Sequence, residues 1–113
     1  MKRGEIWTAS GGSGYAGKPR PVLIVQDDNF AETASVAICP LTTHFIDAPL
    51  IRAAIEPSPG NGLRETSYAM ADKITTISRA RLGQRIGALA PAEMPPINRA
   101  IMLFLGLAGL VRG

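Results

Sequence analysis

The chain has 113 residues, of which 46% are hydrophobic and 19% charged, a composition that predicts one globular domain over residues 1–113 and excludes a disordered or fibrous chain. With one cysteine, Cys39, and one histidine, His44, the chain can form neither an internal disulfide nor a Cys/His zinc site of its own. Twelve basic and nine acidic residues give a net charge of +3, which permits binding to nucleic acid without requiring it.

We find no signal for export or for membrane insertion. Met1–Glu5 includes an acid and a glycine where a signal peptide has an apolar stretch. The longest apolar run, Ala100–Val111, has 12 residues, whereas a membrane-spanning helix needs about 18 or more. We therefore expect a cytoplasmic protein that makes no membrane contact, and the single cysteine fits a reducing compartment.

Two β-strands are predicted near the N-terminus. Glu5–Thr8 is short and rich in β-formers, and Val22–Val25 is a continuous branched run typical of a buried strand. The glycines and serines of Ala9–Lys18 indicate a mobile loop between them. Gly12–Lys18 matches the start of a phosphate-binding P-loop, but Pro19 follows where a serine or threonine should hold magnesium. We therefore interpret this segment as a flexible loop and assign it no nucleotide.

A turn, a short helical segment and a third strand follow. Asp27–Asn29 has the composition of a turn, which we prefer to a magnesium site because no third spaced carboxylate accompanies it. Phe30–Thr33 is expected to form one helical turn and Ser35–Pro40 a strand. Because proline has no N–H to donate, we expect Pro40 to end the pairing of that strand.

Further short strands are predicted before residue 90. In Leu50–Glu56, isoleucines and an alanine alternate with polar positions, which places Arg52 and Glu56 on an exposed face. The remaining strand segments are Ser67–Ala71, Ile74–Ile77 and Gln84–Leu89, with a helical turn at Ser78–Leu82. Short strands joined by tight turns predict a mainly β fold, a small barrel.

A C-terminal helix is predicted to close the domain. Pro91 and the pair Pro95 and Pro96 suit helix starts, and apolar residues recur at helical spacing from Ile97 onward. We expect Ala100–Val111 to be a helix of the core.

The same helix predicts a homodimer. Five consecutive apolar residues, Ile101–Leu105, must point all round it, and a small barrel covers only one side. The other side needs a second copy of the chain or a cover made by loops such as Gly60–Leu63, and we expect the second copy.

Two groups of polar residues are candidate ligands of an anion. Arg20 lies between two prolines, which hold its backbone extended at the entrance to a strand. This pattern alone favours an ordinary exposed arginine, because such residues are common on protein surfaces. A second group follows the third strand, where hydroxyls and an imidazole would gather at the barrel rim: Thr42, Thr43 and His44. No local pattern supplies the base and orienting acid of a serine-type triad.

Five stretches of the chain, in order and at their spacing, resemble the MazF/PemK family of toxin ribonucleases from type II toxin-antitoxin systems. They are Arg3–Trp7, Arg20–Val25, Cys39–Thr42, Ala71–Ile77 and Arg79–Gly87, and Met94–Leu107 resembles the terminal helix of the family. The resemblance covers almost the whole chain. It implies a small SH3-like barrel with a C-terminal helix, assembled as a homodimer, and this agrees with the strand pattern.

The resemblance also implies an enzyme that cuts single-stranded mRNA at specific sequences without a metal or other cofactor. The ribose 2′-hydroxyl attacks the adjacent phosphate and leaves a 2′,3′-cyclic phosphate and a 5′-hydroxyl, so translation and growth stop and DNA does not react. Arg20 falls on the catalytic arginine of the family and Thr42 on its catalytic threonine, residue types that stabilise charge on phosphoryl oxygens. Asp72 matches an acidic position assigned as a base in some members and as structural in others. The implied partner is an antitoxin protein whose disordered segment covers the RNA groove.

We expect RNA to contact both halves of the chain. In the glycine-rich loop, Tyr15 is available to stack on a base and Lys18 to meet a phosphate. The other residues expected to bind RNA are Thr43, His44, Lys73, Thr75 and Arg79.

The sequence departs from the family pattern at Met70, Thr75 and Ser78. Some members carry an arginine proposed as general acid at the first position, many carry arginine at the second, and aspartate is usual at the third. Loss of positive charge at Thr75 is expected to lower RNA affinity or to change the sequence that is cut. Two alternatives to the ribonuclease remain: a non-enzymatic toxin of the same fold that binds DNA gyrase, similar to CcdB, and a catalytically silent RNA-binding relative. Arg20 and Thr42 favour the enzyme.

Overall fold

The computed structural model describes residues 1–11 and 18–108. Its strands are β1 (Glu5–Ala9), β2 (Arg20–Ile24), β3 (Ser35–Thr42), β4 (Arg52–Ile55), β5 (Ser67–Met70), β6 (Thr75–Ser78) and β7 (Leu82–Ala88), and its helix is α1 (Met94–Phe104). Short 3₁₀ turns are η2 (Asp28–Phe30), η3 (Ala71–Lys73), η4 (Arg79–Arg81) and η5 (Pro91–Glu93). The predicted strands are confirmed to within a few residues at each boundary. The helical turn expected at Phe30–Thr33 begins earlier, because Asp27 caps η2 by accepting a hydrogen bond from the N–H of Asn29.

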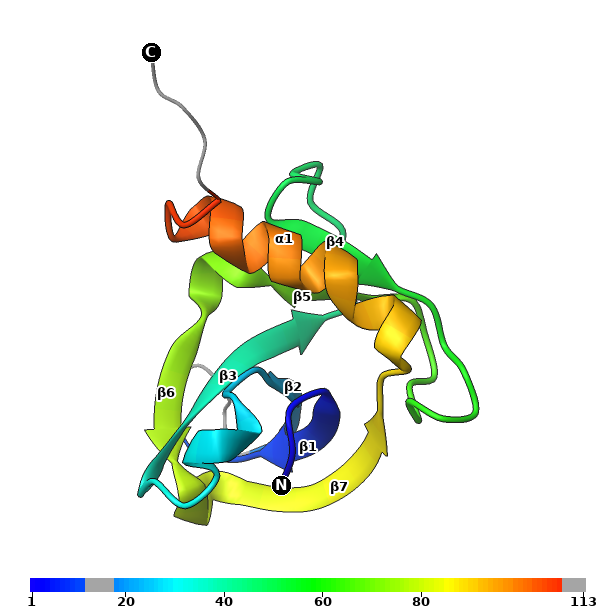
Figure 1. Ribbon diagram of the computed structural model, residues 1–113. Coiled ribbons are helices and arrows are strands. Elements are labelled where there is room, and N and C mark those ends of the chain that lie inside the picture. The colour runs from blue at the N-terminus through cyan, green and yellow to red at the C-terminus, as the bar shows by residue number, and fades with distance from the viewer. Residues whose placement is uncertain (12–17, 109–113) are drawn as a thin grey trace.

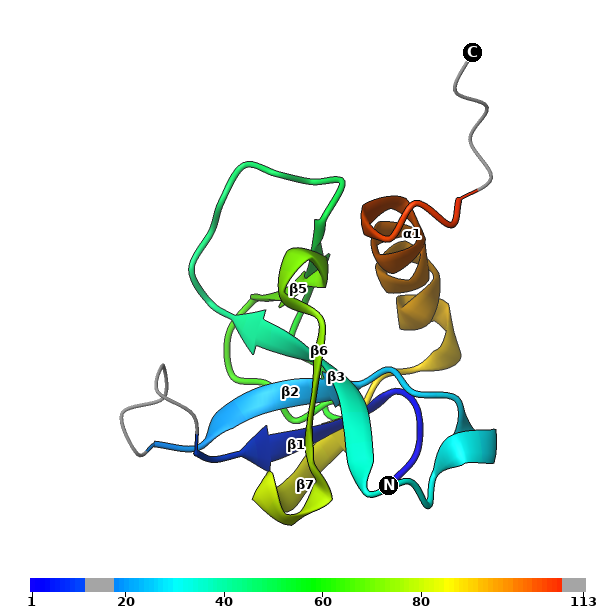
Figure 2. The ribbon, with the colours of Figure 1, turned by 90° about the vertical axis from the view of Figure 1, so that its left-hand side faces the viewer.

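The strands form one antiparallel sheet in the order β4-β5-β3-β2-β1-β7, with β6 also paired to β3. On one side β3 pairs with β2, and on the other its first half pairs with β6 and its end with β5. The sheet curls into a barrel shape, and α1 packs against β4 (Figure 1). In Figure 2, α1 lies beside the end of the sheet that contains β5. The sheet is not closed, because no pairing joins β7 to β4 or β6 in the described part of the chain.

Successive side chains of a strand point to opposite faces of the sheet, and a cluster of buried side chains forms a core on each face. On β2, Leu23 belongs to one cluster of buried side chains, and Val22 and Ile24 belong to the other. The first cluster contains Ile6, Leu23, Cys39, Leu41, Ala53, Ile55, Ala69, Leu89 and Ile97, and the second contains Ala9, Val22, Ile24, Val36, Ile38 and Ile77. Ile97 brings α1 onto the first cluster. Burial raises the pKa of the Cys39 thiol to about 12, so this residue packs the core as a neutral side chain.

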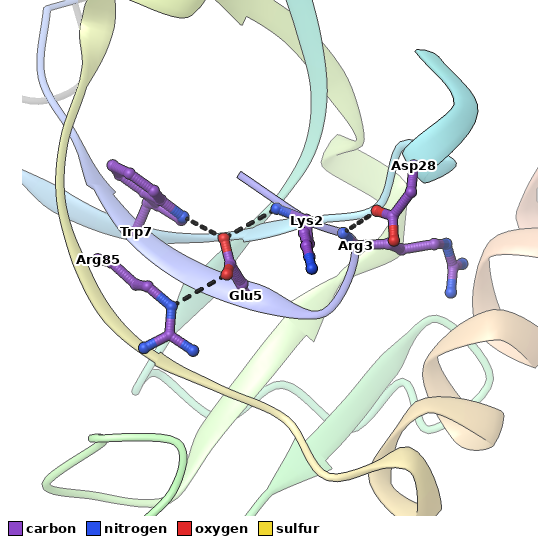
Figure 3. A network of polar contacts seen from close by, with 6 residues as sticks. All are labelled: Lys2, Arg3, Glu5, Trp7, Asp28 and Arg85. Carbon is purple, nitrogen blue, oxygen red and sulfur yellow. Dashed lines mark hydrogen bonds and ion pairs between the residues drawn. The ribbon is translucent and has the colours of Figure 1, made fainter. Parts of the chain in front are cut away.

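Polar contacts of Glu5 hold the start of β1 (Figure 3). Its carboxylate accepts hydrogen bonds from the backbone N–H of Lys2 at 2.8 Å and from Trp7 Nε1 at 3.0 Å, and it forms an ion pair with Arg85 Nε at 3.0 Å. Burial alone would raise the pKa of Glu5, but these hydrogen bonds outweigh burial and the pKa is lowered. The first residues of the chain are thereby tied to β7.

The expectation that Pro40 ends the pairing of its strand is wrong. β3 continues to Thr42, Pro40 pairs with Val22 of β2, and the next residue pairs with Ala69 of β5. A proline removes a single donor, and Pro40 falls between the residues paired with β6 and those paired with β5. The missing N–H therefore interrupts neither pairing.

The C-terminal helix is shorter than the apolar run Ala100–Val111 predicts. α1 ends at Phe104, and Gly106 follows with a φ of 75°. The N–H of Gly106 donates to the carbonyl of Leu103, and the N–H of Leu107 donates to the carbonyl of Met102, the paired bonds of a glycine-terminated helix. The glycine therefore stops the helix inside the apolar run, and residues 109–113 lie outside the described residues.

Candidate active site

Arg20 and Thr42 lie at the ends of two paired strands. β2 and β3 pair in a register that sets Val22 opposite Pro40. The pairing ends there, and Arg20, the first residue of β2, and Thr42, the last residue of β3, each lie two residues beyond this last pair and line the same hollow. Strand pairing therefore unites two residues that no local motif connects.

A hollow of about 120 Å³ opens at this point, which we call the catalytic hollow. It is lined by Arg20, Pro21, Leu41, Thr42, Thr43 and Ser67. The side chain of Arg20 is exposed and forms no hydrogen bond or ion pair with any described residue. Its guanidinium donors are therefore available to an anion bound in the hollow.

The hydroxyl of Thr42 is oriented by the chain that follows it. Its Oγ1 accepts a hydrogen bond from the backbone N–H of His44 at 3.1 Å. A hydroxyl that accepts through a lone pair keeps its own hydrogen for donation. Thr42 is thus prepared to donate to an oxygen in the hollow, whereas the side chains of Thr43 and His44 are exposed beside it.

The catalytic hollow continues into a larger one of about 350 Å³, which the sequence did not identify and which we call the side hollow. Its lining is Pro21, Thr43, Gly62, Leu63, Arg64, Glu65, Ser67 and Ile86. The two hollows share Pro21, Thr43 and Ser67, so they adjoin, and we call the two together the groove. The available sequence signal was the adjacent charges Arg64 and Glu65, which by themselves are typical of any exposed loop.

Aromatic residues beside the groove were also missed. Tyr68 of β5 pairs with Thr42 of β3, and its ring meets that of Phe45 edge to face with centroids 5.6 Å apart. Phe45 is 62% exposed. Nothing in the sequence connects the two rings, because their contact depends on the pairing of β3 with β5.

Asp72, expected as a catalytic residue, is bound by Arg52 of β4. Arg52 Nε donates to Oδ1 at 2.7 Å and Nη2 donates to Oδ2 at 3.0 Å. These hydrogen bonds lower the pKa of Asp72 against the opposing effect of burial. The expectation that Arg52 faces solvent is wrong: its side chain is 6% exposed, because Asp72 pairs its charge. Asp72 does not line the groove.

Lys73 and Thr75 lie outside the groove lining as well. Lys73 ends η3 and Thr75 begins β6, where it pairs with Ile38 in the middle of β3. Both side chains are exposed. The structure therefore brings Arg20, Thr42 and Thr43 together and leaves these two residues along a different part of β3.

Arg79 lies near the opposite end of β3 from Thr42. It follows Ser78, which pairs with Ser35 at the start of that eight-residue strand. At about 3.3 Å per residue the two ends are about 23 Å apart along the strand. The guanidinium of Arg79 donates to the backbone carbonyls of Ala31 and Thr33, so an RNA contact would have to compete with these bonds.

The expectation for Tyr15 lies outside the described residues, because these omit positions 12–17. Lys18 is described and exposed at the entrance to β2. Within residues 1–11 and 18–108, no group of three or more His, Cys, Asp or Glu side chains is arranged to hold a metal ion. In the same part of the chain, we find no helix with the length and apolar character that crossing a membrane requires.

Known proteins are similar to this chain in fold and in sequence. Residues 2–105 match the family model described as PemK-like, MazF-like toxin of type II toxin-antitoxin system. The chain belongs to this toxin family. Among curated members, a probable endoribonuclease MazF from Mycolicibacterium smegmatis is 52% identical over 109 residues, which cover 96% of this chain and 100% of the relative.

Solved structures of the MazF-like toxins superpose on the chain over most of its length. An endoribonuclease in complex with its cognate antitoxin, from a mycobacterial species, has a TM-score of 0.79 at 31% identity and covers 97% of this chain and 99% of its own. The Mycobacterium tuberculosis toxin MazF-mt6 has a TM-score of 0.77 at 27% identity, with 91% and 97% covered. The mainly antiparallel sheet with a C-terminal helix, predicted from the sequence, is confirmed as the fold of this family.

Proposed function

We propose that the chain is the toxin of a type II toxin-antitoxin system and cuts single-stranded mRNA as a metal-independent endoribonuclease. The observation that carries this proposal is the juxtaposition of Arg20 and Thr42, a guanidinium without a partner among the described residues and an oriented hydroxyl, in the lining of one hollow. Relatives named endoribonuclease favour this function over a gyrase-binding toxin of the same fold.

The proposed reaction is an attack of the ribose 2′-hydroxyl on the adjacent phosphorus. A bond forms between O2′ and phosphorus as the 2′-hydroxyl loses its proton, and the bond from phosphorus to O5′ breaks as O5′ gains a proton, which leaves a 2′,3′-cyclic phosphate and a 5′-hydroxyl. Negative charge gathers on the non-bridging oxygens in the transition state, and fixed donors aimed at them lower the barrier. Arg20 supplies a charged, bidentate donor and Thr42 a neutral one, so Arg20 contributes more. DNA lacks the nucleophile and is not cut.

We assign Asp72 to the support of the site and not to proton transfer. A carboxylate that accepts two hydrogen bonds from Arg52 and whose pKa is lowered is a poor proton acceptor. Its ion pair fixes η3 to β4, and η3 directly follows β5, whose Ser67 lines both hollows. Thr43, His44 and Lys18 remain proposed RNA contacts at the rim, and Lys73 and Thr75 remain proposed contacts for RNA farther from the hollow. Tyr15 remains a proposed stacking partner for a base.

The proposed partners are a second copy of this chain and a cognate antitoxin. Apolar side chains remain exposed on and after α1, among them Met102 at 44%, Phe104 at 47% and Leu105 at 49%. A second copy would cover them, since the loop of residues 60–63 packs on β7 and not on this face. A relative has been solved in complex with its cognate antitoxin, and we propose an antitoxin that covers the groove of this chain in the same cytoplasmic compartment. The whole chain acts as one domain in this proposal.

Incubation of the purified protein with a long unstructured RNA in EDTA tests the function. We expect fragments that carry 2′,3′-cyclic phosphate and 5′-hydroxyl ends. Arg20→Ala should slow cleavage by about 100-fold or more, since one removed oxyanion-type donor is worth on the order of 3 kcal/mol. Thr42→Ala should be slowed less, because a neutral donor is lost.

A matched control is Arg99→Ala, which removes an exposed arginine of α1 that does not line the groove. It should cut at the wild-type rate. Full activity of a folded Arg20→Ala protein, or loss of all activity in EDTA, would contradict the proposal.

A further inference from the structure

The side hollow lies directly beside the proposed reaction centre. It shares Pro21, Thr43 and Ser67 with the catalytic hollow, so an RNA whose phosphate meets Arg20 brings a neighbouring nucleotide to the side hollow. Its volume of about 350 Å³ falls within the range of about 300–1,000 Å³ that small-molecule sites occupy. A single nucleobase fits a space of this size.

The walls of the side hollow combine apolar and polar surfaces. Pro21 of β2, Leu63 of the loop between β4 and β5, and Ile86 of β7 supply apolar contacts. The flat face of a base packs well against such surfaces. Thr43 and Ser67 add hydroxyls, so one edge of a bound base would meet polar groups and its faces would meet apolar ones.

The loop wall is fixed in place by the buried side chain of Asn61. Its Oδ1 accepts hydrogen bonds from the N–H groups of Ser58 and Leu63, both at 3.0 Å. Gly62 has a φ of 71°, and a Cβ at this position would lie 2.6 Å from the side chain of Ile86. The loop therefore packs directly on β7, and the side hollow is formed before any ligand arrives.

Two side chains of opposite charge in this wall have no partner among the residues that the structure describes. Arg64 and Glu65 are exposed, and neither side chain forms a hydrogen bond or ion pair with another described residue. Elsewhere in the described chain, Arg52 with Asp72 and Arg85 with Glu5 do form ion pairs. A neighbouring guanidinium and carboxylate that leave each other unpaired present donors and acceptors side by side to a ligand.

We propose that the side hollow binds the base next to the scissile phosphate, and that Arg64 and Glu65 select a base with an exocyclic amino group over uracil. This inference rests on the proposed ribonuclease function and adds the determinant of its sequence preference. The carboxylate of Glu65 accepts from the amino group, and Arg64 donates to the neighbouring ring nitrogen or carbonyl. Uracil reverses this pattern, because it has a carbonyl where cytosine has its amino group and a ring N–H where cytosine has its ring acceptor, so its carbonyl faces the carboxylate of Glu65 and its N–H faces Arg64.

Cleavage of an RNA pool with a randomised segment, followed by mapping of the new 5′-hydroxyl ends, tests this inference. The wild-type protein should disfavour uracil at one position adjacent to the cut. Glu65→Gln replaces the carboxylate with an amide that also donates, so uracil should become acceptable there. We expect the preference at that position to weaken about 10-fold, the scale of one good base contact.

Two further variants separate base selection from other effects. Glu32→Gln removes an exposed carboxylate that does not line the groove, and should leave the profile unchanged. Arg64→Gln should change the preference at the same position as Glu65→Gln. If Arg64→Gln instead slows all sequences equally and lowers the salt dependence of binding, Arg64 meets a phosphate and the inference is wrong.

The remaining outcomes are also decisive. An unchanged cleavage profile in both side-hollow variants would overturn the inference while leaving the ribonuclease intact. The same holds if the variants weaken binding of the antitoxin and leave the profile unchanged, because the side hollow would then serve the protein partner. If the wild-type protein cuts no RNA in the pool, the proposed function itself fails.

Discussion

Replacement of Asp72 by asparagine tests whether the ion pair with Arg52 supports the fold or takes part in the reaction. The substitution keeps the shape of the side chain and removes its charge. Arg52, with a side chain 6% exposed, then keeps its positive charge without a counterion, while Asp72 is 24% exposed. Removal of one partner from a buried pair costs about 3–5 kcal/mol, and the partial exposure of Asp72 favours the lower end.

A loss of about 3 kcal/mol should lower the melting temperature by about 12 °C, given an unfolding entropy of about 2.1 cal/mol/K per residue. Differential scanning calorimetry at pH 7 measures this shift. Asp47→Asn is the matched control, because it makes the same substitution at an exposed residue that has no side-chain partner among the described residues. Its melting temperature should equal that of the wild type.

The destabilisation should also depend on pH. In the unfolded chain an aspartate titrates near pH 3.9, and in the folded protein the pKa of Asp72 is lower because Arg52 donates to it. Between these two values the folded state binds fewer protons than the unfolded state, so acid removes the stability that the pair contributes. The difference between wild type and Asp72→Asn should therefore be complete above about pH 5 and shrink as the pH falls below about 4.

The activity of the same variant separates the two roles of Asp72. At a temperature where Asp72→Asn is fully folded, it should cut RNA at close to the wild-type rate, since the side chain does not line the groove. A variant with an unchanged melting temperature, or one that is folded but inactive, would refute this reasoning and return Asp72 to the reaction.

Three further predictions concern packing, assembly and reactivity. Gly87→Ala should lower the free energy of unfolding, measured by urea titration, by about 1–3 kcal/mol, because the new methyl group would lie 2.5 Å from backbone atoms of the 60–61 turn. Gly60→Ala, whose new methyl group would have its nearest contact at 3.8 Å, should be tolerated in the same titration. Sedimentation of the wild type should give a dimer, and Leu105→Asp should shift it to a folded monomer, so a wild-type monomer with full activity would contradict the expected assembly. Cys39 should not react with a thiol reagent at pH 8 until the protein is unfolded, because burial raises its pKa to about 12; rapid reaction in the native state would disprove this.

Most strands were predictable because their residues have strong local preferences. The branched run that includes Val22 and Ile24 is buried on both faces of the sheet and needs no knowledge of its neighbours. The C-terminal end of α1 was harder to predict, since a glycine within an apolar run indicates a helix end only once its left-handed backbone conformation is known. The prediction for Pro40 was wrong for a related reason. The effect of its missing N–H on strand pairing depends on which strand each neighbouring residue pairs with, and the sequence does not show this.

The site was predictable in its residue types and not in its surroundings. The resemblance assigned roles to Arg20 and Thr42, since the flanking prolines alone favour an ordinary exposed arginine at position 20, and the structure places both residues in the lining of one hollow. Arg52 was misplaced because strand alternation assigns a face without knowing what covers it, and its partner, Asp72, lies twenty residues further along the chain. The side hollow escaped notice because it depends on a loop that is shaped by long-range contact with β7.

β3, which carries Thr42, and the segment that follows it differ in how easily they can move. To release this residue from its place, β3 must separate from β2 and β5, which are held in the same sheet as β6. Amide protons along β3 should therefore exchange with solvent only in openings close to complete unfolding. Residues 43–50 just beyond it carry mostly exposed side chains and belong to no strand, so they can adapt to a ligand at little cost. A reacting phosphate would thus meet a hydroxyl on a rigid strand beside one adaptable segment, and an inhibitor can block such a centre more readily by covering it than by loosening it.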